Sequence, residues 1–429
     1  MKDKNKNLYS TIFIIALMSF GGIYILGNFI CNGIFFKNIF FELEKDSALD
    51  FYVFLKNSGR DSYSVGHGIN PPLVKIIMRI FYKSLPIEVQ EIFSQSAISN
   101  TEIDIRTVAS AQMSYLMFEI LTVAFIFLLL YKYKIGSAIQ KTFFSFVSIT
   151  SIGFFYAYER GNIIILSVLF LLIFVIFLDS EKKIYRLISS ICLALSAGIK
   201  LYPVLYGLVL LKKDKKKQMF VSILCGFLVI LLPFAFLGGL DGIIGMNKGL
   251  SSNNESGIKP GYLNLTSIIM TVLMFCGKTE LSPKHIFILR ILVYIFCFCL
   301  MCFSIMFKEK WKKYLAITLA MFSITGTSHM YMLSFMIIPI IEFFNQSEHK
   351  RAHIFYLICF IGTMAIIPGF TPSFLIQYRI YNYRLTYIMV LHELFLLLLN
   401  IAVFIEGLSV LKNAIKDGKK ITKKGYADL

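Results

Sequence analysis

The sequence predicts an all-α polytopic membrane protein, a chain that crosses a bilayer many times as helices. Of its 429 residues 57% are hydrophobic, and the mean hydropathy of +0.71 is well above that of soluble domains. Apolar runs that could enter or span a bilayer recur from the first one, Leu8–Ile30, to the last part of the chain. Lysines and arginines gather between these runs, as they do at the cytoplasmic ends of membrane helices.

The first apolar run follows a short basic leader, and we expect it to be retained as a span. It lacks a small-residue cleavage site and is too long for the core of a signal peptide. The net charge of +18 is explained by the bias of membrane proteins toward a basic cytoplasmic face, so no nucleic-acid partner is expected. The eight cysteines lie mostly inside apolar runs and show neither CxxC metal spacing nor a disulfide framework, so we expect them to be small residues of the lipid phase. No cofactor is expected.

About twelve spans place the basic clusters on one side of the membrane and both chain ends in the cytoplasm. The expected spans are 8–30, 112–131, 141–157, 163–178, 186–199, 201–211, 219–237, 285–307, 313–328, 330–344, 355–370 and 385–411. The whole chain, 1–429, is then one membrane domain with two long outer segments, about 32–111 and about 238–284. On this threading 26 of the 43 lysines and arginines fall on the short inner segments, which agrees with the positive-inside rule.

Two of these spans must form a hairpin whose turn is the sequence "ERGN". A single helix from Lys141 to Leu178 would be roughly 57 Å long at ~1.5 Å per residue, far beyond a hydrocarbon core of about 30 Å. Both ends of this stretch are flanked by lysines, so the chain turns back between them. Glu159 and Arg160 therefore lie at an outward-facing tip.

A second hairpin, Arg186–Leu211, has arms too short to cross the bilayer. Its arms would measure roughly 21 and 16 Å. The tip "GIKLYP", which contains Lys200, is then expected below the outer surface, where irregular backbone is tolerated only beside a cavity. A recessed cavity that opens to the outside is therefore predicted.

Both outer segments contain short helical patterns. In the first, "PPLVKIIMRIFYKSL" puts proline at a helix start and separates apolar from basic residues, which is typical of an interfacial helix. The second begins with the Gly-, Ser- and Asn-rich stretch "GLSSNNESGIKPG" and continues with the apolar run "YLNLTSIIMTVLMF", for which we expect a re-entrant or interfacial helix.

Ionisable residues collect on the outer side: Asp46 and Asp50 in the first segment, the pair in "ERGN", Lys200 and His329. Taken singly, each has a structural explanation: the aspartates can be solvated in a loop, Glu159 and Arg160 can form a salt-bridged helix cap, Lys200 can snorkel to the headgroups, and His329 can be a satisfied tip residue. Together they indicate a substrate path, because ionisable groups at membrane depth are costly. Arginine and lysine suit a phosphate, and a carboxylate can act as general base for a hydroxyl.

These stretches resemble glycosyltransferase family 87, the mannosyltransferase-like group (DUF2029) of the type C membrane glycosyltransferases. The family patterns are D-x-x-x-Y with Y-P-P-L, then E-R-G-Q, K-x-x-P, N-Q-S-L and a late Ser/Trp/His turn. Their counterparts here, "DFYVF…GINPPL", "YERGN", "GIKLYP", "NLTS" and "TGTSHMY", follow in the same order. The departures are Asn162 for the glutamine, Asn70 for the tyrosine before the prolines, and the missing tryptophan.

The resemblance implies a GT-C fold and transfer of a hexose, with mannose as the expected sugar, from a polyprenyl-phosphate donor. The acceptor is a hydroxyl of a cell-envelope glycan or glycolipid on the extracytoplasmic face, and the reaction inverts the anomeric centre without metal. Asp50 is expected as the catalytic base, with Asp46 as the alternative, and Arg160 and Lys200 as the phosphate-binding pair. Residues expected to position substrates are Glu159, Asn162, Tyr202, Asn264, Ser267, His329 and Tyr331, with either His329 or Tyr331 matching the family histidine.

Two other function classes fit a polytopic chain. Polysaccharide polymerases and ligases also have about twelve spans, but they usually rely on arginines and histidines in an outer loop. A lipid-linked sugar transporter or flippase would be expected to show internal repeats and charges near the bilayer midplane. The acidic first outer segment and "ERGN" favour the transferase. The sugar, the acceptor, the pathway and the oligomeric state are not encoded in any pattern of the sequence.

Overall fold

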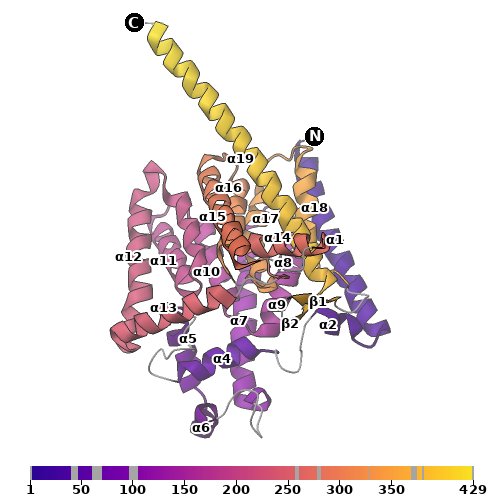
Figure 1. Ribbon diagram of the computed structural model, residues 1–429, viewed down its shortest axis with the longest axis vertical. Helices are drawn as coiled ribbons and strands as arrows, with labels where there is room; N and C mark the ends of the chain where they lie inside the picture. Colours follow the sequence, from indigo (N-terminus) through magenta and orange to yellow (C-terminus); the bar gives the residue numbers. More distant parts are fainter. Residues whose placement is uncertain are drawn as a thin grey trace.

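The computed structural model describes residues 2–39, 47–59, 70–95, 105–256, 260–277, 282–326, 328–368, 374–378 and 381–427. Over these residues the chain is almost entirely helical, and the expected all-α polytopic fold is confirmed (Figure 1). The strands within this part are a short antiparallel hairpin, β1 (Phe374–Tyr378) and β2 (Tyr381–Leu385), which connects two helices.

Long apolar helices in the described part of the chain identify a multi-pass membrane protein. Five are long and apolar enough to cross a bilayer, and the pair α8 and α9, bent by 50°, would make a sixth. These helices are α1 (Lys2–Ile30), α7 (Ala109–Tyr133), α8 (Ala138–Ile149), α9 (Ile152–Arg160), α12 (Lys216–Leu231) with its extension η4 (Leu232–Phe236), α15 (Pro283–Met306) and α19 (Tyr387–Ala427).

Shorter apolar helices occupy the remaining expected spans. They are α10 (Ile164–Phe177), α11 (Lys183–Ile199), η2 (Tyr202–Leu210), α16 (Lys310–Ile324), η5 (Met330–Met336), α17 (Ile337–Asn345) and α18 (His353–Met364). Each of the twelve expected spans thus coincides with a helix or a pair of helices. Because these shorter helices do not have the length of a full crossing, the count of about twelve stays a prediction.

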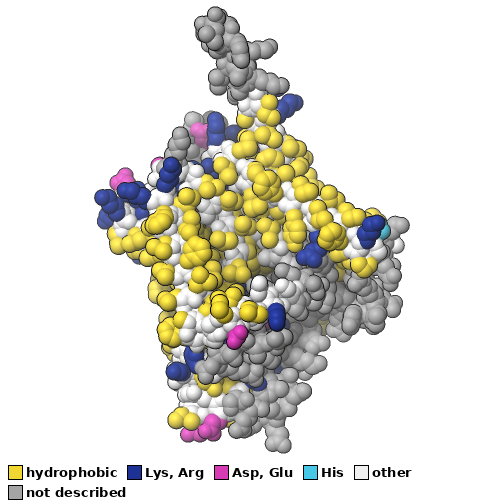
Figure 2. All heavy atoms as spheres, turned by 60° about the vertical axis from the view of Figure 1, so that its left-hand side comes forward, with side chains coloured by type: hydrophobic (Ala, Val, Ile, Leu, Met, Phe, Trp, Pro, Cys, Tyr) yellow, Lys and Arg dark blue, Asp and Glu magenta, His cyan; other side chains and the backbone are white. Residues whose placement is uncertain are grey.

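The short and the long helices differ in how far they are buried inside the molecule. Helices α10, α16, η5 and α17 bury most of their residues, as expected for largely apolar helices in the interior of the molecule. By contrast, only 11% of the apolar stretch of α12 is buried, and its phenylalanines Phe220, Phe227 and Phe236 are exposed. Figure 2 shows hydrophobic side chains over much of this face, with lysines and arginines gathered toward the upper edge. The outer helices therefore present the lipid-facing surface.

The predicted inner loops lie together at one end of the molecule. Asp179, just after α10, forms salt bridges with Lys215, before α12, and with Lys310, at the start of α16. Lys312 of α16 pairs with Glu406 in the second half of α19 at 2.6 Å. Three basic loops that are far apart in the sequence thus share one end, as the threading predicts.

Contacts of the first and last inner loops complete this basic end. The hydroxyl of Tyr133, at the end of α7, donates to Glu342 of α17 at 2.5 Å, and Tyr9 of α1 donates to the carbonyl of Lys350 at 3.2 Å. Figure 1 shows α1 starting at this end and α19 projecting beyond it. The helix α19 runs through most of the basic tail, which the apolar pattern alone did not predict.

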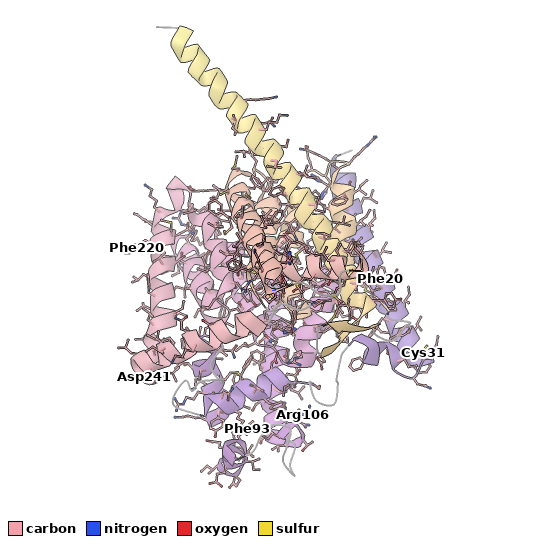
Figure 3. The ribbon with its side chains drawn as sticks, viewed as in Figure 1. Phe20, Cys31, Phe93, Arg106, Phe220 and Asp241 are labelled. Carbon is pink, nitrogen blue, oxygen red and sulfur yellow. The ribbon has the colours of Figure 1, made fainter. Side chains whose placement is uncertain are left out.

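The two outer segments lie away from this basic end, with α14 nearer the middle of the molecule than their other helices (Figure 1). The first contributes α2 (Ile34–Ile39), α4 (Leu49–Ser58), α5 (Pro72–Lys83), α6 (Ile87–Gln95) and η1 (Ile105–Thr107); the second contributes α13 (Gly239–Ser256) and α14 (Leu265–Phe275). In Figure 3, Phe220 lies in the first turns of α12 and Asp241 at the start of α13, and Phe93 and Arg106 lie at the far end from the basic loops. Helix α5 begins at its prolines as predicted, whereas α13 forms in a Gly-, Ser- and Asn-rich stretch that did not predict a helix.

Candidate active site

Asp50 stands at the centre of the candidate site. It lies in the first turn of α4, where a carboxylate is favoured by the helix dipole. Its Oδ1 accepts a hydrogen bond from Arg160 Nη2 at 2.7 Å, and its Oδ2 accepts one from Asn162 Nδ2 at 2.6 Å. The side chains of Arg160 and Asp50 are 26% and 17% exposed, so the ion pair is largely shielded from water. Asp50 is thus in direct contact with two residues that lie 110 and 112 positions further along the chain.

The turn "ERGN" orients two of these three residues. Helix α9 ends at Arg160, and Gly161 takes the left-handed conformation, with φ of 61°, that commonly ends a helix. The amide of Asn162 then donates to the carbonyl of Ala157 at 2.8 Å. Asn162 Oδ1 accepts from the amide of Ile164 at 3.0 Å, which leaves its Nδ2 for Asp50. The predicted hairpin tip is therefore a capped, fixed turn.

The first outer segment is attached to the same turn through its backbone. The amide of Ala48 donates to the carbonyl of Glu159 at 2.6 Å, directly before α4 begins. A Cβ atom at Gly161 would come within 2.8 Å of Phe51 Cβ, so the glycine allows α4 to approach closely. The carbonyl of Glu159 thus helps to hold Asp50 in place, while a role for its carboxylate in positioning substrate stays a prediction. Asp46 lies outside the described residues.

Lys200 supplies a second cation beside Asp50. It follows α11 and precedes η2, so it occupies the predicted tip of the second hairpin. Its Nζ lies 5.8 Å from the centre of the Phe54 ring on α4. Burial lowers the pKa of Lys200 to about 8, while the negative charge of Asp50 acts in the opposite direction. Arg160, Lys200 and Asp50 therefore form one electrostatic group.

Tyrosines and a histidine border this charged group. Tyr331 lies within electrostatic range of Asp50 and Arg160 and against Asn162, and Tyr202 lies next to Tyr331. The ring centroids of His329 and Tyr331 are 5.3 Å apart. Both residues of the turn "TGTSHMY" that could match the family histidine therefore lie at the site. The structure brings them together without distinguishing their roles.

Asn264 and Ser267 lie at the start of α14, beside the late turn. Asn264 caps the helix by accepting from the Ser267 amide at 2.8 Å, and its Nδ2 donates to the carbonyl of Gly326 at 3.1 Å. The amide of Leu263 donates to the carbonyl of Ser328 at 2.7 Å. The contacts of Asn264 are thus structural and join two of the predicted motifs, and the expected role of Asn264 and Ser267 in positioning substrate stays a prediction.

Two residues of this region were not singled out by the sequence. The ring of Tyr262 meets His329 edge-on, with ring centroids 4.6 Å apart. Glu393 of α19 accepts hydrogen bonds from the amide of Gly261 at 3.0 Å and from Thr271 Oγ1 at 3.2 Å. A single glutamate in the apolar run "YIMVLHELFLLLLN" is a signal that could have drawn attention to Glu393.

The cluster joins a carboxylate, two cations and several hydroxyl and amide groups, which suits acid–base chemistry beside an anion. Across the described residues, His, Cys, Asp and Glu do not form a group of three that could hold a metal ion.

Comparison with known proteins supports a glycosyl-transfer chemistry. A family model described as glycosyltransferase family 87 matches residues 105–248, about a third of the chain, which confirms that resemblance. The matched span contains Arg160, Asn162 and Lys200, but neither Asp50 nor the late turn. A search of curated proteins found no match. The family 87 match and the apolar helices identify the chain as a multi-pass membrane glycosyltransferase that resembles family 87.

Proposed function

We propose that the protein transfers a hexose, with mannose as the first sugar to test, from a polyprenyl-phosphate donor to an acceptor hydroxyl. The reaction takes place on the extracytoplasmic face of the cell membrane and serves the synthesis of a cell-envelope glycan or glycolipid. The observation that carries the proposal is the carboxylate of Asp50, held by Arg160 and Asn162 next to Lys200. This arrangement combines a base for a hydroxyl with two cations for a phosphate.

The distribution of charge supports an extracytoplasmic site. The basic loops gather at the end where α1 begins, and the positive-inside rule assigns that end to the cytoplasm. Asp50 and "ERGN" belong to segments at the other end, so the proposed site is extracytoplasmic. A donor whose lipid tail lies in the bilayer can bring its phosphate to such a site.

Asp50 is the proposed catalytic base. Its carboxylate takes the proton of the acceptor hydroxyl while the hydroxyl oxygen forms a bond to the anomeric carbon. The bond between the anomeric carbon and the phosphate oxygen breaks, and the electron pair leaves with the polyprenyl phosphate. Attack from the face opposite the phosphate inverts the configuration.

Arg160 and Lys200 are the proposed phosphate ligands. The donor phosphodiester carries one negative charge, and the departing phosphate gains a second, which two cations stabilise more strongly in the transition state than in the ground state. Arg160 is already paired with Asp50 in the structure. Donor binding therefore exchanges the carboxylate for the phosphate on Arg160, and this exchange releases Asp50 Oδ1 to act as base.

The test is transfer by the purified protein in lipid nanodiscs. The protein is given polyprenyl-phosphate mannose, the corresponding glucose and arabinose donors, and an extract of glycolipid acceptors. We expect release of polyprenyl phosphate together with a product whose anomeric configuration, measured by NMR, is opposite to that of the donor. Retained configuration would contradict the direct displacement, and movement of the intact donor across the bilayer without transfer would favour a flippase.

A further inference from the structure

Glu393 is a carboxylate buried in a helix that is long and apolar enough to span the membrane. Its side chain lies on α19 and the residue is 2% exposed. An ionisable group in such a place is costly, and its presence generally reflects a function with an identifiable partner. Glu393 has no part in the proposed transfer chemistry, so its burial calls for another function.

Those partners belong to the second outer segment. The amide of Gly261 donates to Oε1 at 3.0 Å. The hydroxyl of Thr271 lies 3.2 Å from the same oxygen and 3.1 Å from the carbonyl of Ser267, and its one proton can be donated to either. The other oxygen, Oε2, is buried and has no hydrogen-bond partner in the described part of the chain. Glu393 therefore uses one acceptor atom to connect α19 with Gly261, just before α14, and with Thr271, within α14.

These hydrogen bonds help to fix the position of Tyr262. Gly261, on one side of Tyr262, is held by Glu393, and Leu263, on the other side, donates to the carbonyl of Ser328 at 2.7 Å. With its backbone held on both sides, the Tyr262 ring meets His329 at 4.6 Å. His329 in turn contacts the Tyr331 ring, which lies beside the charged group of Asp50.

We propose that Glu393 is a positioning residue for the transfer reaction: by holding Gly261 it fixes Tyr262 and His329 as an aromatic wall of the sugar-binding site. Such a wall suits a pyranose ring, because aromatic faces pack against its C–H bonds while the phenol group can hydrogen-bond to its hydroxyls. The inference rests on the proposed function. It adds that recognition of the sugar depends on a residue of α19, which is connected to the site through the segment that carries Tyr262.

Variants of Glu393 can keep or remove its hydrogen-bond acceptor. Glu393→Gln keeps an oxygen where both donors need it and places its amide group where Oε2 has no partner. Glu393→Ala removes the acceptor, and Thr271→Val removes one of the two donors. Glu406→Gln changes another carboxylate of the same helix, at the end where it pairs with Lys312, and serves as the matched control.

Turnover is measured in nanodiscs with the polyprenyl-phosphate sugar that the wild type uses, and affinity is measured with polyprenyl phosphate that carries no sugar. We expect Glu393→Ala to lower turnover by about 10- to 100-fold, the scale of a misplaced substrate group. Thr271→Val should give a smaller loss, and Glu393→Gln and Glu406→Gln should stay close to the wild type. Affinity for polyprenyl phosphate should not change, because Arg160 and Lys200 are untouched.

A double-mutant cycle with Tyr262→Ala tests whether Glu393 acts through the wall. If it does, Glu393→Ala combined with Tyr262→Ala is no slower than the slower single variant; losses that multiply would overturn the proposal. Equal losses in Glu393→Gln and Glu393→Ala would also overturn it, and so would loss of polyprenyl-phosphate affinity together with a lower unfolding temperature. Absence of wild-type turnover with any polyprenyl-phosphate sugar would refute the proposed function itself, whereas wild-type turnover in Glu393→Ala would refute only the positioning role.

Discussion

The pH dependence of the reaction tests the role of Lys200. Burial lowers the pKa of this lysine from its ordinary value of 10.5 to about 8, against the opposing charge of Asp50. Below about pH 8 the side chain is protonated and can bind the donor phosphate. At pH 9 only about a tenth of it carries the charge, whereas an unperturbed lysine would remain almost fully charged.

The assay is kcat/KM for the donor between pH 6 and 10, which reports groups of the free enzyme. The donor phosphodiester does not titrate in this range. We therefore expect the wild-type value to fall about tenfold per pH unit above pH 8. In Lys200→Arg the guanidinium stays charged, so this alkaline fall should move above pH 10.

Two further variants complete this experiment. Lys200→Gln should be slow at pH 7 and should show no alkaline fall, while Lys284→Arg, an exposed lysine at the start of α15, should keep the wild-type profile. A fall near pH 8 that persists in Lys200→Arg would refute the reasoning, because the titrating group would then be another residue.

Two substitutions test how the site is built. Gly161→Ala should lower stability by at least about 1–2 kcal/mol, because the residue has a φ of 61° and a Cβ would lie 2.8 Å from Phe51 Cβ. Thermal unfolding measures this loss, and Gly22→Ala on α1, which meets nothing within 4 Å, is the control; equal unfolding temperatures would contradict the docking of α4 on the turn. Asn264→Ala should cost about 1 kcal/mol through the lost helix cap, and Asn264→Ser should recover most of it. A folded Asn264→Ser variant without turnover would instead assign Asn264 to substrate binding.

The helices and turns were predictable because local patterns determine them. The length of an apolar run and the lysines at its ends together required a hairpin, and the structure has one whose turn contains Gly161 in the left-handed conformation. The prolines before Leu73 likewise fixed the start of α5. The Gly- and Ser-rich composition of α13 carries no comparable helix signal, so this helix was missed.

The candidate site was predictable only as a set of residues on one face. The charges of the outer side marked Asp50, Arg160 and Lys200, and the resemblance to family 87 assigned the role of base to Asp50. No sequence pattern shows that Arg160 forms an ion pair with Asp50. Such pairing depends on how distant segments pack. The helix cap formed by Asn264 could be predicted, because asparagine before an apolar helix is a favoured N-cap. The hydrogen bond between Glu393 and Gly261 could not, because it joins segments that only the fold brings together.

The central claim is that Asp50 is the base of a polyprenyl-phosphate-dependent transfer. The most direct measurement compares turnover and polyprenyl-phosphate affinity in Asp50→Asn, with Asp241→Asn, an exposed aspartate of α13, as control. The asparagine can still accept from Arg160 but cannot take a proton, so turnover should fall by about 10²- to 10⁴-fold. Donor affinity should be kept or increased, because Arg160 is no longer neutralised by a carboxylate. Turnover of Asp50→Asn close to that of the wild type would contradict the account.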